Sequence, residues 1–329
     1  LYTLQNGNKK FIAIDLKSPE GKKTLLDLIA SADVFLSSVR EKSLEKLGLW
    51  YDDIKKINPE IIYAHFNGFG YEGEEASRPG FDMAAFWSRS GLLIDSSVKG
   101  TPPIKPIGGM GDATSASLLL NGILSAVIGK LTTGKGTFVS SSLLGSGIWF
   151  GGLGVVSAYF GNEYPKDYMD PPTPFTHAYV CKDGEWLQTT VIDYDGNFKK
   201  MCSLLEIEEI AENPKFTTIK ECKKNMPEFV GIVCQAFKKK DRKEWAEIFS
   251  NANVVYEFIS HLSDVSKDKQ AWANGYLKEV TFENGQKVPM PMPPIRFSEY
   301  GQKEFETSGK IGKDTDEILK GIGYSEEKI

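Results

Sequence analysis

Residues 34–66, VFLSSVREKSLEKLGLWYDDIKKINPEIIYAHF, decide the fold class. The stretch opens with an apolar run at 34–39 and closes with another at 61–66, and both runs have the length and composition of buried strands. Between them the spacing predicts two short helices, at 42–48 and 51–57. Two strands joined by helices predict a βαβ unit with parallel strands, and therefore an α/β fold.

The same alternation extends to both sides of this stretch. Residues 11–16, FIAIDL, are expected to form a further buried strand, followed by a helix that Ser18 caps and Pro19 opens. Later in the chain, residues 113–131 predict a long apolar helix and residues 137–142 a strand. In parallel sheets of this kind, ligands bind at the carboxyl ends of the strands.

The pattern changes in the second half of the chain. Residues 162–174 contain four prolines and are typical of a linker. Strands at 178–181 and 186–191 are expected to form a hairpin, and charged amphipathic helices follow to about residue 249. Before the linker, 149–160 predicts an apolar helix, and the chain ends with an amphipathic helix at 314–329 that is broken at Gly321.

Composition excludes several classes of protein. Of the 329 residues, 41% are hydrophobic and 25% are charged, as in an ordinary globular protein. The net charge is −5, and acidic and basic residues are interspersed, so the charge pattern argues against a nucleic-acid partner. The four cysteines are scattered and form no CxxC pair, which is typical of reduced thiols in a cytoplasmic protein and not of a metal site. No apolar run appears long enough for a membrane span, so no membrane partner is expected.

The segment 105–112, KPIGGMGD, contains the strongest candidate for chemistry. It places Asp112 directly after a glycine cluster and before the apolar helix predicted at 113–131. A helix N-terminus favours an ionised carboxylate, and glycines leave room for a bulky acyl group, so Asp112 is a candidate covalent nucleophile. The alternative is a carboxylate that only caps the helix, and local spacing alone favours that interpretation.

Two other motifs do not support chemistry of their own. Residues 129–136, GKLTTGKG, nearly match a phosphate-binding loop, but the order here is helix, loop, strand, so a glycine cap at the helix end is expected instead. The three histidines are too dispersed for a metal cluster or a catalytic triad. His65 is expected to be a core or strand-end residue.

Several cations follow the predicted strands. Arg40, Lys46 and Lys17 lie at or just after strand ends, where a phosphate-binding cluster and isolated surface charges are both reasonable interpretations. Arg78 precedes the apolar segment 81–87, which is expected to be helical, and would join such a cluster. Asp82 opens that segment and either caps it or approaches the ligand.

Together, short motifs in a fixed order resemble one protein family. The chain resembles the class III CoA-transferases of the CaiB/BaiF type, and is most similar to the branch that acts on 2-hydroxy acids and enoyl acids in amino-acid fermentation. The matching stretches are residues 8–18, 32–34, 68–70, 79–82, 111–112, 133–136, 174–175 and 270–274.

This resemblance implies a two-domain architecture. The family combines a Rossmann-like large domain, built on a parallel sheet, with a smaller α+β domain, and two chains form an interlocked homodimer. The implied domains are residues 1–165 (large CoA-binding domain), 172–282 (small domain) and 283–329 (return to the large domain). About 60 residues of the family's large domain have no counterpart before Leu1, so the N-terminus is expected to be missing.

The resemblance also implies a reaction and its residues. The family moves CoA from an acyl-CoA to a carboxylic acid through an aspartyl anhydride and an aspartyl-CoA thioester, without a metal. The nucleophile falls on Asp112, and the backbone of Gly109 and Gly111 is expected to stabilise oxyanions. The implied CoA contacts are Asp15, Lys17, Ser38, Val39, Arg40, Lys46, Arg78, Gly80, Phe81 and Asp82.

Two alternatives remain at this level. An acyl-CoA racemase or epimerase of the same superfamily would need a base, but the family's histidine position holds Phe81, which accepts no proton. A non-catalytic CoA-binding subunit would bind CoA without turnover. The sequence also leaves the identity of the acyl group undetermined, because the aromatic pair Phe86 and Trp87 fits either an acyl pocket or a hydrophobic core.

Overall fold

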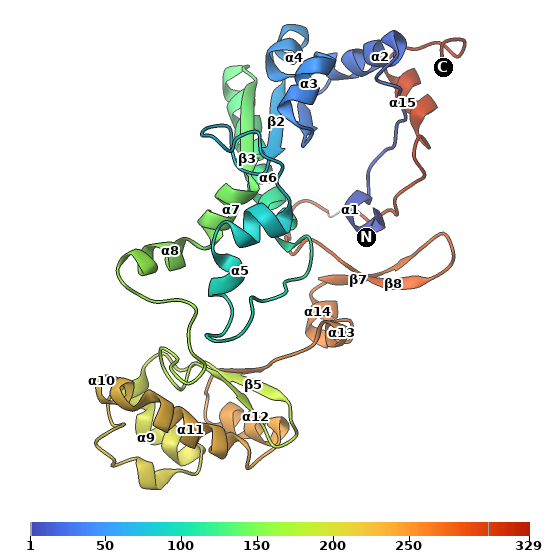
Figure 1. Cartoon of the computed structure of the whole chain (residues 1–329). Helices are drawn as coiled ribbons and strands as arrows, with labels where there is room; N and C mark the ends of the chain where they lie inside the picture. The colour runs from blue at the N-terminus through green and yellow to red at the C-terminus, as the bar shows by residue number, and fades with distance from the viewer. Residues whose placement is uncertain (1, 302) are drawn as a thin grey trace. The chain divides into compact units, whose positions relative to one another are not determined.

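The computed structural model describes residues 2–301 and 303–329 (Figure 1). Packing divides the chain into two compact units, and each is described by itself. Unit 1 comprises Leu1–Leu92, Lys105–Val156 and Asp268–Ile329, and unit 2 comprises Leu93–Ile104 and Ser157–Lys267. The domain boundaries expected from the sequence remain a prediction.

A parallel sheet forms the centre of unit 1. It contains β1 (Val34–Ser37), β2 (Ile62–Asn67) and β3 (Thr137–Ser142), in the order β1-β2-β3, with both pairs of neighbours parallel. The connection from β1 to β2 contains α3 (Glu41–Leu47) and α4 (Tyr51–Ile57). The predicted βαβ unit, and with it the α/β class with a parallel sheet, is confirmed.

Helices and one hairpin complete unit 1 (Figure 1). The hairpin, which the sequence analysis did not predict, consists of the antiparallel strands β7 (Leu277–Thr281) and β8 (Lys287–Pro291). The helices wholly within unit 1 are α1 (Tyr2–Asn6), α2 (Pro19–Ala30), the π-helix η1 (Asp82–Ser88), α6 (Met110–Thr133), α7 (Leu143–Phe150), α14 (Lys269–Ala273) and α15 (Thr315–Gly321), in addition to α3 and α4. Two short helices, α5 (Leu92–Asp95) and α8 (Gly152–Tyr159), cross a boundary between the units.

The strand predicted at 11–16 is wrong. Phe11 donates its backbone N–H to Asp314 Oδ2 at 2.8 Å and accepts the Asp314 N–H at 2.9 Å, while the Ala13 N–H bonds to Thr315 Oγ1 at 3.1 Å. A strand needs a neighbouring strand for its backbone groups. Here the segment at the start of α15 supplies those partners, so an apolar run that is typical of a strand stays irregular.

Two predicted helices have different bounds in the structure. The single helix predicted at 149–160 is two helices, α7 and α8, which are separated at Gly151. In the segment 314–329 the predicted break at Gly321 is confirmed, because α15 ends at that residue, but no α-helix resumes after it. By contrast, Gly134 at φ 69° closes α6 and donates its N–H to Lys130 O at 2.8 Å, which confirms the predicted glycine cap before β3.

Unit 2 contains a small antiparallel sheet covered by helices. The predicted hairpin is confirmed as β4 (Ala178–Val180) and β5 (Trp186–Thr189), and β6 (Tyr256–Phe258), which was not predicted, pairs with β5. The helical elements that follow are α9 (Tyr194–Leu204), η2 (Glu208–Ile210), α10 (Ile219–Cys222), η3 (Lys223–Asn225), α11 (Met226–Phe237), α12 (Arg242–Asn251) and α13 (Leu262–Val265).

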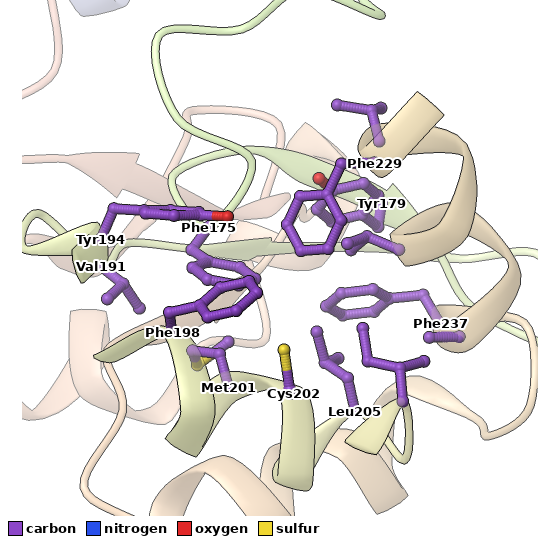
Figure 2. Close-up of a cluster of buried hydrophobic side chains, with 14 of the residues drawn as sticks. Phe175, Tyr179, Val191, Tyr194, Phe198, Met201, Cys202, Leu205, Phe229 and Phe237 are labelled. Atoms are coloured by element: carbon purple, nitrogen blue, oxygen red, sulfur yellow. The ribbon is translucent and has the colours of Figure 1, made fainter. Parts of the chain in front are cut away.

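Aromatic side chains fill the core of unit 2 (Figure 2). Tyr179 stacks on Phe237 with ring centroids 4.6 Å apart, so β4 packs directly on α11. Cysteines line the same core: burial raises the pKa of Cys181 and of Cys202 to about 12, which keeps both thiols protonated. All four cysteines are unpaired in the structure, in agreement with the expected reduced thiols.

The long helix α6 corrects one expectation. Its 24 residues, with a mean hydropathy of 1.4, are long and apolar enough to cross a membrane, although the sequence analysis expected no such run. Only 6% of its most apolar window is buried inside the chain. Core helices of soluble proteins meet the same criteria of length and composition, so this finding alone does not show that α6 lies in a membrane.

Candidate active site

Asp112 lies in the first turn of α6. Gly109 precedes the helix with a positive φ of 83°, a conformation that favours glycine, and its carbonyl accepts the Ala113 N–H at 2.9 Å. The helix begins at Met110, three residues before the predicted start, so Asp112 is inside the helix rather than before it. Its side chain is exposed and has no hydrogen-bonding or ion-pair partner within residues 2–301 and 303–329.

A second carboxylate, that of Asp82, is hydrogen-bonded to the glycine segment that precedes α6. Asp82 opens η1, is 7% exposed, and accepts the Gly109 N–H through Oδ2 at 2.7 Å. Its other oxygen, Oδ1, is buried and has no hydrogen-bonding partner in the described part of the chain. The sequence left open whether Asp82 caps its helix or approaches the ligand, and the structure places it against Gly109, the residue that precedes the helix of the candidate nucleophile.

Gly111 lets η1 and α6 approach each other closely. A Cβ at this position would lie 2.2 Å from Asp82 Oδ1 and 2.5 Å from the Phe86 ring, both far below contact distance. Phe86 is itself buried, in a core cluster with Ala85 and Leu143. Of the aromatic pair noted in the sequence, Phe86 therefore belongs to the core.

The electrostatics of Asp112 differ from the expectation of a carboxylate stabilised only by a helix N-terminus. Partial burial, and then the negative charge of Asp82, raise its pKa above the usual range. Partial burial, together with the neighbouring carboxylate, therefore outweighs the favourable helix end. A carboxylate with a raised pKa is a stronger nucleophile once it is ionised.

The backbone donors around Asp112 are not equivalent. The Gly109 N–H is already used by Asp82, so it does not point to an incoming ligand. The first N–H groups of a helix have no partner within the helix, and within the described residues the N–H groups of Gly111 and Asp112 have no backbone partner. Of Gly109 and Gly111, the two glycines expected to stabilise oxyanions, only Gly111 thus keeps an N–H without a backbone partner in the described residues.

The predicted helix at 81–87 is a π-helix. The bond from the Arg89 N–H to Ala84 O at 3.1 Å spans five residues, as π-helices require, and the hydroxyl of Ser88 donates to Met83 O at 2.6 Å. At Gly147 of α7, a Cβ would lie 2.6 Å from Phe86 O, so η1 packs closely on α7 as well as on α6. No pattern in the sequence distinguishes this geometry from an ordinary helix.

The loop between β1 and α3 holds three predicted CoA contacts, Ser38, Val39 and Arg40, and all three are exposed. The Arg40 carbonyl accepts the N–H groups of Ser43 and Leu44, at 2.9 and 3.1 Å, so the loop leads directly into α3.

The predicted cations Lys17, Arg40 and Lys46 form no ion pair with any residue that the structure describes. Lys17 follows a turn that Asp15 closes: Asp15 Oδ1 accepts the Lys17 N–H at 2.9 Å. Lys46 lies in the last turn of α3. These charges are available for a phosphate group, whereas the Asp15 carboxylate is committed to the turn.

The remaining predicted contacts precede η1. Arg78 pairs with Glu75 and lies over the Phe69 ring, with 5.1 Å between the guanidinium carbon and the ring centroid. Gly80 packs against Gly68, where a Cβ on either residue would lie 2.5–2.6 Å from the other's Cα. Phe81 is 77% exposed. Arg78 is therefore held by protein groups, and Phe81 presents only hydrocarbon.

A cavity that the sequence analysis missed lies at the carboxyl ends of β2 and β3. It has a volume of about 450 Å³ and is lined by Gly70, Tyr71, Glu72, Ser140, Ser141, Ser142 and Gly145. The rule that ligands bind at these strand ends was the signal that would have found it. Among residues 2–301 and 303–329, no group of three His, Cys, Asp or Glu side chains is placed to hold a metal ion.

Known proteins resemble this chain over its whole length. The family model described as CoA-transferase family III matches residues 1–315. The (R)-2-hydroxy-4-methylpentanoate CoA-transferase of Clostridioides difficile is 36% identical over 329 residues, which cover 100% of this chain and 82% of that protein. The cinnamoyl-CoA:phenyllactate CoA-transferase of Clostridium sporogenes is 33% identical over 332 residues, covering 100% and 81%.

A solved structure has the same fold. The crystal structure of a CAIB/BAIF family protein from Brucella suis superimposes with a TM-score of 0.83 at 25% sequence identity. The match covers 98% of this chain and 83% of that one.

Proposed function

The chain belongs to CoA-transferase family III, and on this premise we propose that it moves CoA from a 2-hydroxyacyl- or enoyl-CoA to a carboxylic acid, with Asp112 as the nucleophile. One observation carries the assignment of the nucleophile. Asp112 is an exposed, unpartnered carboxylate at the start of α6, on a glycine segment that a second carboxylate holds in place.

The proposed reaction consists of two symmetrical halves. An Asp112 oxygen attacks the thioester carbonyl of the donor, the C–S bond breaks, and a mixed anhydride and CoA thiolate form. The thiolate then attacks the aspartyl carbonyl, which releases the donor acid and leaves an aspartyl-CoA thioester. The acceptor carboxylate attacks that thioester and forms the second anhydride, and the returning thiolate attacks its acyl carbonyl, which yields the new acyl-CoA and free Asp112.

Two features of the site support these steps. The Gly111 and Asp112 N–H groups lack backbone partners within the described residues and are candidate oxyanion donors, each contributing about 3 kcal/mol by analogy with other oxyanion holes. The raised pKa of Asp112 favours attack by the ionised carboxylate. Each tetrahedral intermediate carries one negative oxygen, so one or two such donors suffice.

The thiolate must stay bound between its departure and its return, because only a bound thiolate reacts in an effectively unimolecular step. We assign this role to exposed groups of unit 1. Lys17, Arg40 and Lys46 form no ion pairs within the described residues and suit the phosphates of CoA. The Ser38 and Val39 loop, Gly80 and Phe81 are proposed to contact the rest of the cofactor, which acts as a substrate thioester.

The substrate class comes from the two relatives. Both are named for 2-hydroxy acids or for their unsaturated counterparts, and both exceed 30% identity over the full chain. A screen of 2-hydroxy acids as acceptors, with one branched or aryl acyl-CoA as donor, identifies the natural pair. Amino-acid fermentation is the proposed setting.

Trapping the covalent intermediates tests the proposal. After addition of acyl-CoA, hydroxylamine should convert Asp112 to its hydroxamate, and mass spectrometry should locate the modification on that residue alone. The same protein without acyl-CoA is the control and should remain unmodified. Asp112→Asn should lose at least about a thousandfold in kcat, which corresponds to roughly 4 kcal/mol. Substantial activity in Asp112→Asn would remove Asp112 from the mechanism.

The racemase alternative has little support at the site. Phe81 is 77% exposed and offers no proton acceptor where a racemase needs one. Exchange of the substrate α-proton in deuterated water, without any acceptor acid, would favour the racemase. A non-catalytic subunit would instead bind CoA and show neither exchange nor transfer.

The proposed assembly is a homodimer with a second copy of this chain. Large apolar side chains of α6, α7 and the start of α8 are exposed in the single chain, among them Leu120, Leu124, Ile128, Leu131, Trp149, Phe150 and Leu153. Exposed apolar area of this extent is typical of a permanent interface. The helix also carries Asn121, Ser125 and Lys130, which suit a protein partner better than lipid, so we propose a cytoplasmic interlocked dimer.

A further inference from the structure

His65 is a buried histidine that joins two loops of the sheet edge. It is 1% exposed and lies in β2, near its carboxyl end. Its Nε2 lies 2.7 Å from the backbone carbonyl oxygen of Val39, and its Nδ1 contacts the hydroxyl of Tyr71. A carbonyl only accepts, so Nε2 carries the proton, and Nδ1 accepts from the Tyr71 hydroxyl. The hydrogen bonds thus fix one neutral tautomer.

Neighbouring rings fix the orientation of this imidazole. Trp50 packs edge-on against His65, with ring centroids 5.2 Å apart, and also lies beside Tyr71. Burial lowers the pKa of His65, which keeps the ring neutral near pH 7. A clamped neutral ring has no freedom to act as a general base, but it holds its two partners at a constant separation.

The two partners of His65 belong to separate loops. Val39 lies between the exposed residues Ser38 and Arg40, in the loop after β1. Tyr71 follows a turn after β2, where Asn67 closes a ring of two hydrogen bonds with Gly70, at 2.8 and 3.1 Å. His65 is therefore the side chain through which the loop after β1 is connected to the loop after β2.

We propose that His65 is a positioning residue for CoA binding, which acts by holding the Val39 carbonyl toward the protein. With that carbonyl directed inward, the neighbouring Ser38 and Arg40 side chains are presented outward to the ligand. This inference rests on the proposed function, because it takes the loop after β1 as part of the CoA site. His65 itself touches neither the ligand nor the reacting atoms.

Three variants separate positioning from general packing. His65→Gln keeps an acceptor and a donor on one side chain, so it retains both hydrogen bonds. His65→Leu loses both. Tyr63→Phe is the matched control: Tyr63 is fully buried two residues earlier in β2, and its hydroxyl donates to Leu49 O at 2.9 Å, but it does not contact the loop after β1. It therefore measures the loss of one buried hydrogen bond in the same core.

Steady-state kinetics gives the decisive readout. The KM for acyl-CoA should rise about five- to tenfold in His65→Leu, with kcat changed less than twofold, which is the scale of one lost hydrogen bond. His65→Gln should restore most of the affinity, and Tyr63→Phe should leave KM unchanged. An unchanged KM in His65→Leu, or an equal rise in Tyr63→Phe, would overturn the proposal.

Direct binding keeps this inference distinct from the proposed reaction. Calorimetric titration of free CoA into each variant measures affinity without turnover, and His65→Phe, which keeps a buried ring but removes both ring nitrogens and with them the bond to Val39, replaces His65→Leu if that variant does not fold. Weaker CoA binding on loss of the His65 contacts supports the positioning role even if the wild-type chain transfers no CoA. Equal affinity for CoA in all variants of an active enzyme overturns the positioning role alone.

Discussion

Asp82 Oδ2 accepts the backbone N–H of Gly109 at 2.7 Å, so the first residue of η1 is fixed to the residue that precedes α6. This bond brings a second carboxylate close to Asp112, whose pKa is raised by partial burial and then by the charge of Asp82. Asp82 thus holds the glycine segment in position and also contributes to the raised pKa of the proposed nucleophile.

Substitution of Gly111 should disrupt the site. In Gly111→Ala the new Cβ would meet Asp82 Oδ1 at 2.2 Å and the Phe86 ring at 2.5 Å, so η1 must move away from α6. We expect the free energy of unfolding to fall by about 1–3 kcal/mol and transferase activity to fall at least tenfold. Urea denaturation and initial rates measure the two effects.

Gly129→Ala in the same helix is the control for that substitution. Nothing lies within 4 Å of a Cβ at Gly129, so alanine should be neutral or should stabilise α6 by up to about 1 kcal/mol. Equal behaviour of the two variants would contradict the close contact at Gly111.

Removal of the Asp82 charge should make Asp112 more acidic. Asp82→Asn retains an oxygen that accepts the Gly109 N–H but eliminates the negative charge that raises the pKa of Asp112. The ionised form of Asp112 should then persist to lower pH, so the acid limb of the pH–rate profile should move toward lower pH. A shift toward higher pH would contradict the arrangement. Asp82→Ala also loses the hydrogen bond to Gly109, so its kcat should be lower than that of Asp82→Asn.

The stability of the chain should depend on pH through the buried His65 and the half-buried His177. Burial lowers the pKa of His65 in unit 1 and of His177 in unit 2, while in the unfolded chain both titrate near pH 6.5. Below that pH the unfolded state binds more protons than the folded state, so the free energy of unfolding should decrease as the pH falls, and should be insensitive to these groups above it.

Denaturation experiments between pH 5 and 8 measure this dependence. In His65→Gln the contribution of His65 to the pH dependence of the free energy of unfolding should disappear, while the contribution of His177 should remain. If the variant and the wild type lose stability equally on acidification, His65 is not buried in the neutral form.

A charge on the exposed face of α6 should dissociate the proposed dimer. Ile128 is 65% exposed in the single chain, and Ile128→Glu would place a carboxylate in the apolar interface, where an unpaired charge is strongly unfavourable. Light scattering coupled to gel filtration should detect monomers of about half the wild-type mass. Leu262→Glu, at a similarly exposed leucine of α13, is the control and should not change the mass. A wild-type chain that is monomeric at all concentrations would contradict the assembly.

The local sequence was sufficient to predict most of the parallel sheet and to identify the candidate nucleophile. Hydrophobic runs and turn residues placed β2, β3, α3 and α4 within about one residue, because these elements are determined by contacts between near neighbours. The same signals failed at 11–16, whose backbone partners come from Asp314 and Thr315 at the far end of the chain. At η1 they predicted a helix but not its π geometry, since a π-helix has no distinct apolar period.

The sequence by itself therefore determined the α/β class, the parallel order of strands and helices, and Asp112 at the start of an apolar helix after glycines. Only the tertiary structure decided which groups meet there. It brought the Asp82 carboxylate into a hydrogen bond with the Gly109 N–H, while the Gly111 N–H has no backbone partner in the described residues. It also connected Val39 to Tyr71 through the side chain of His65. The physical reason is that periodicity encodes which face of an element is buried, whereas hydrogen bonds between distant residues depend on how closely the packed elements approach.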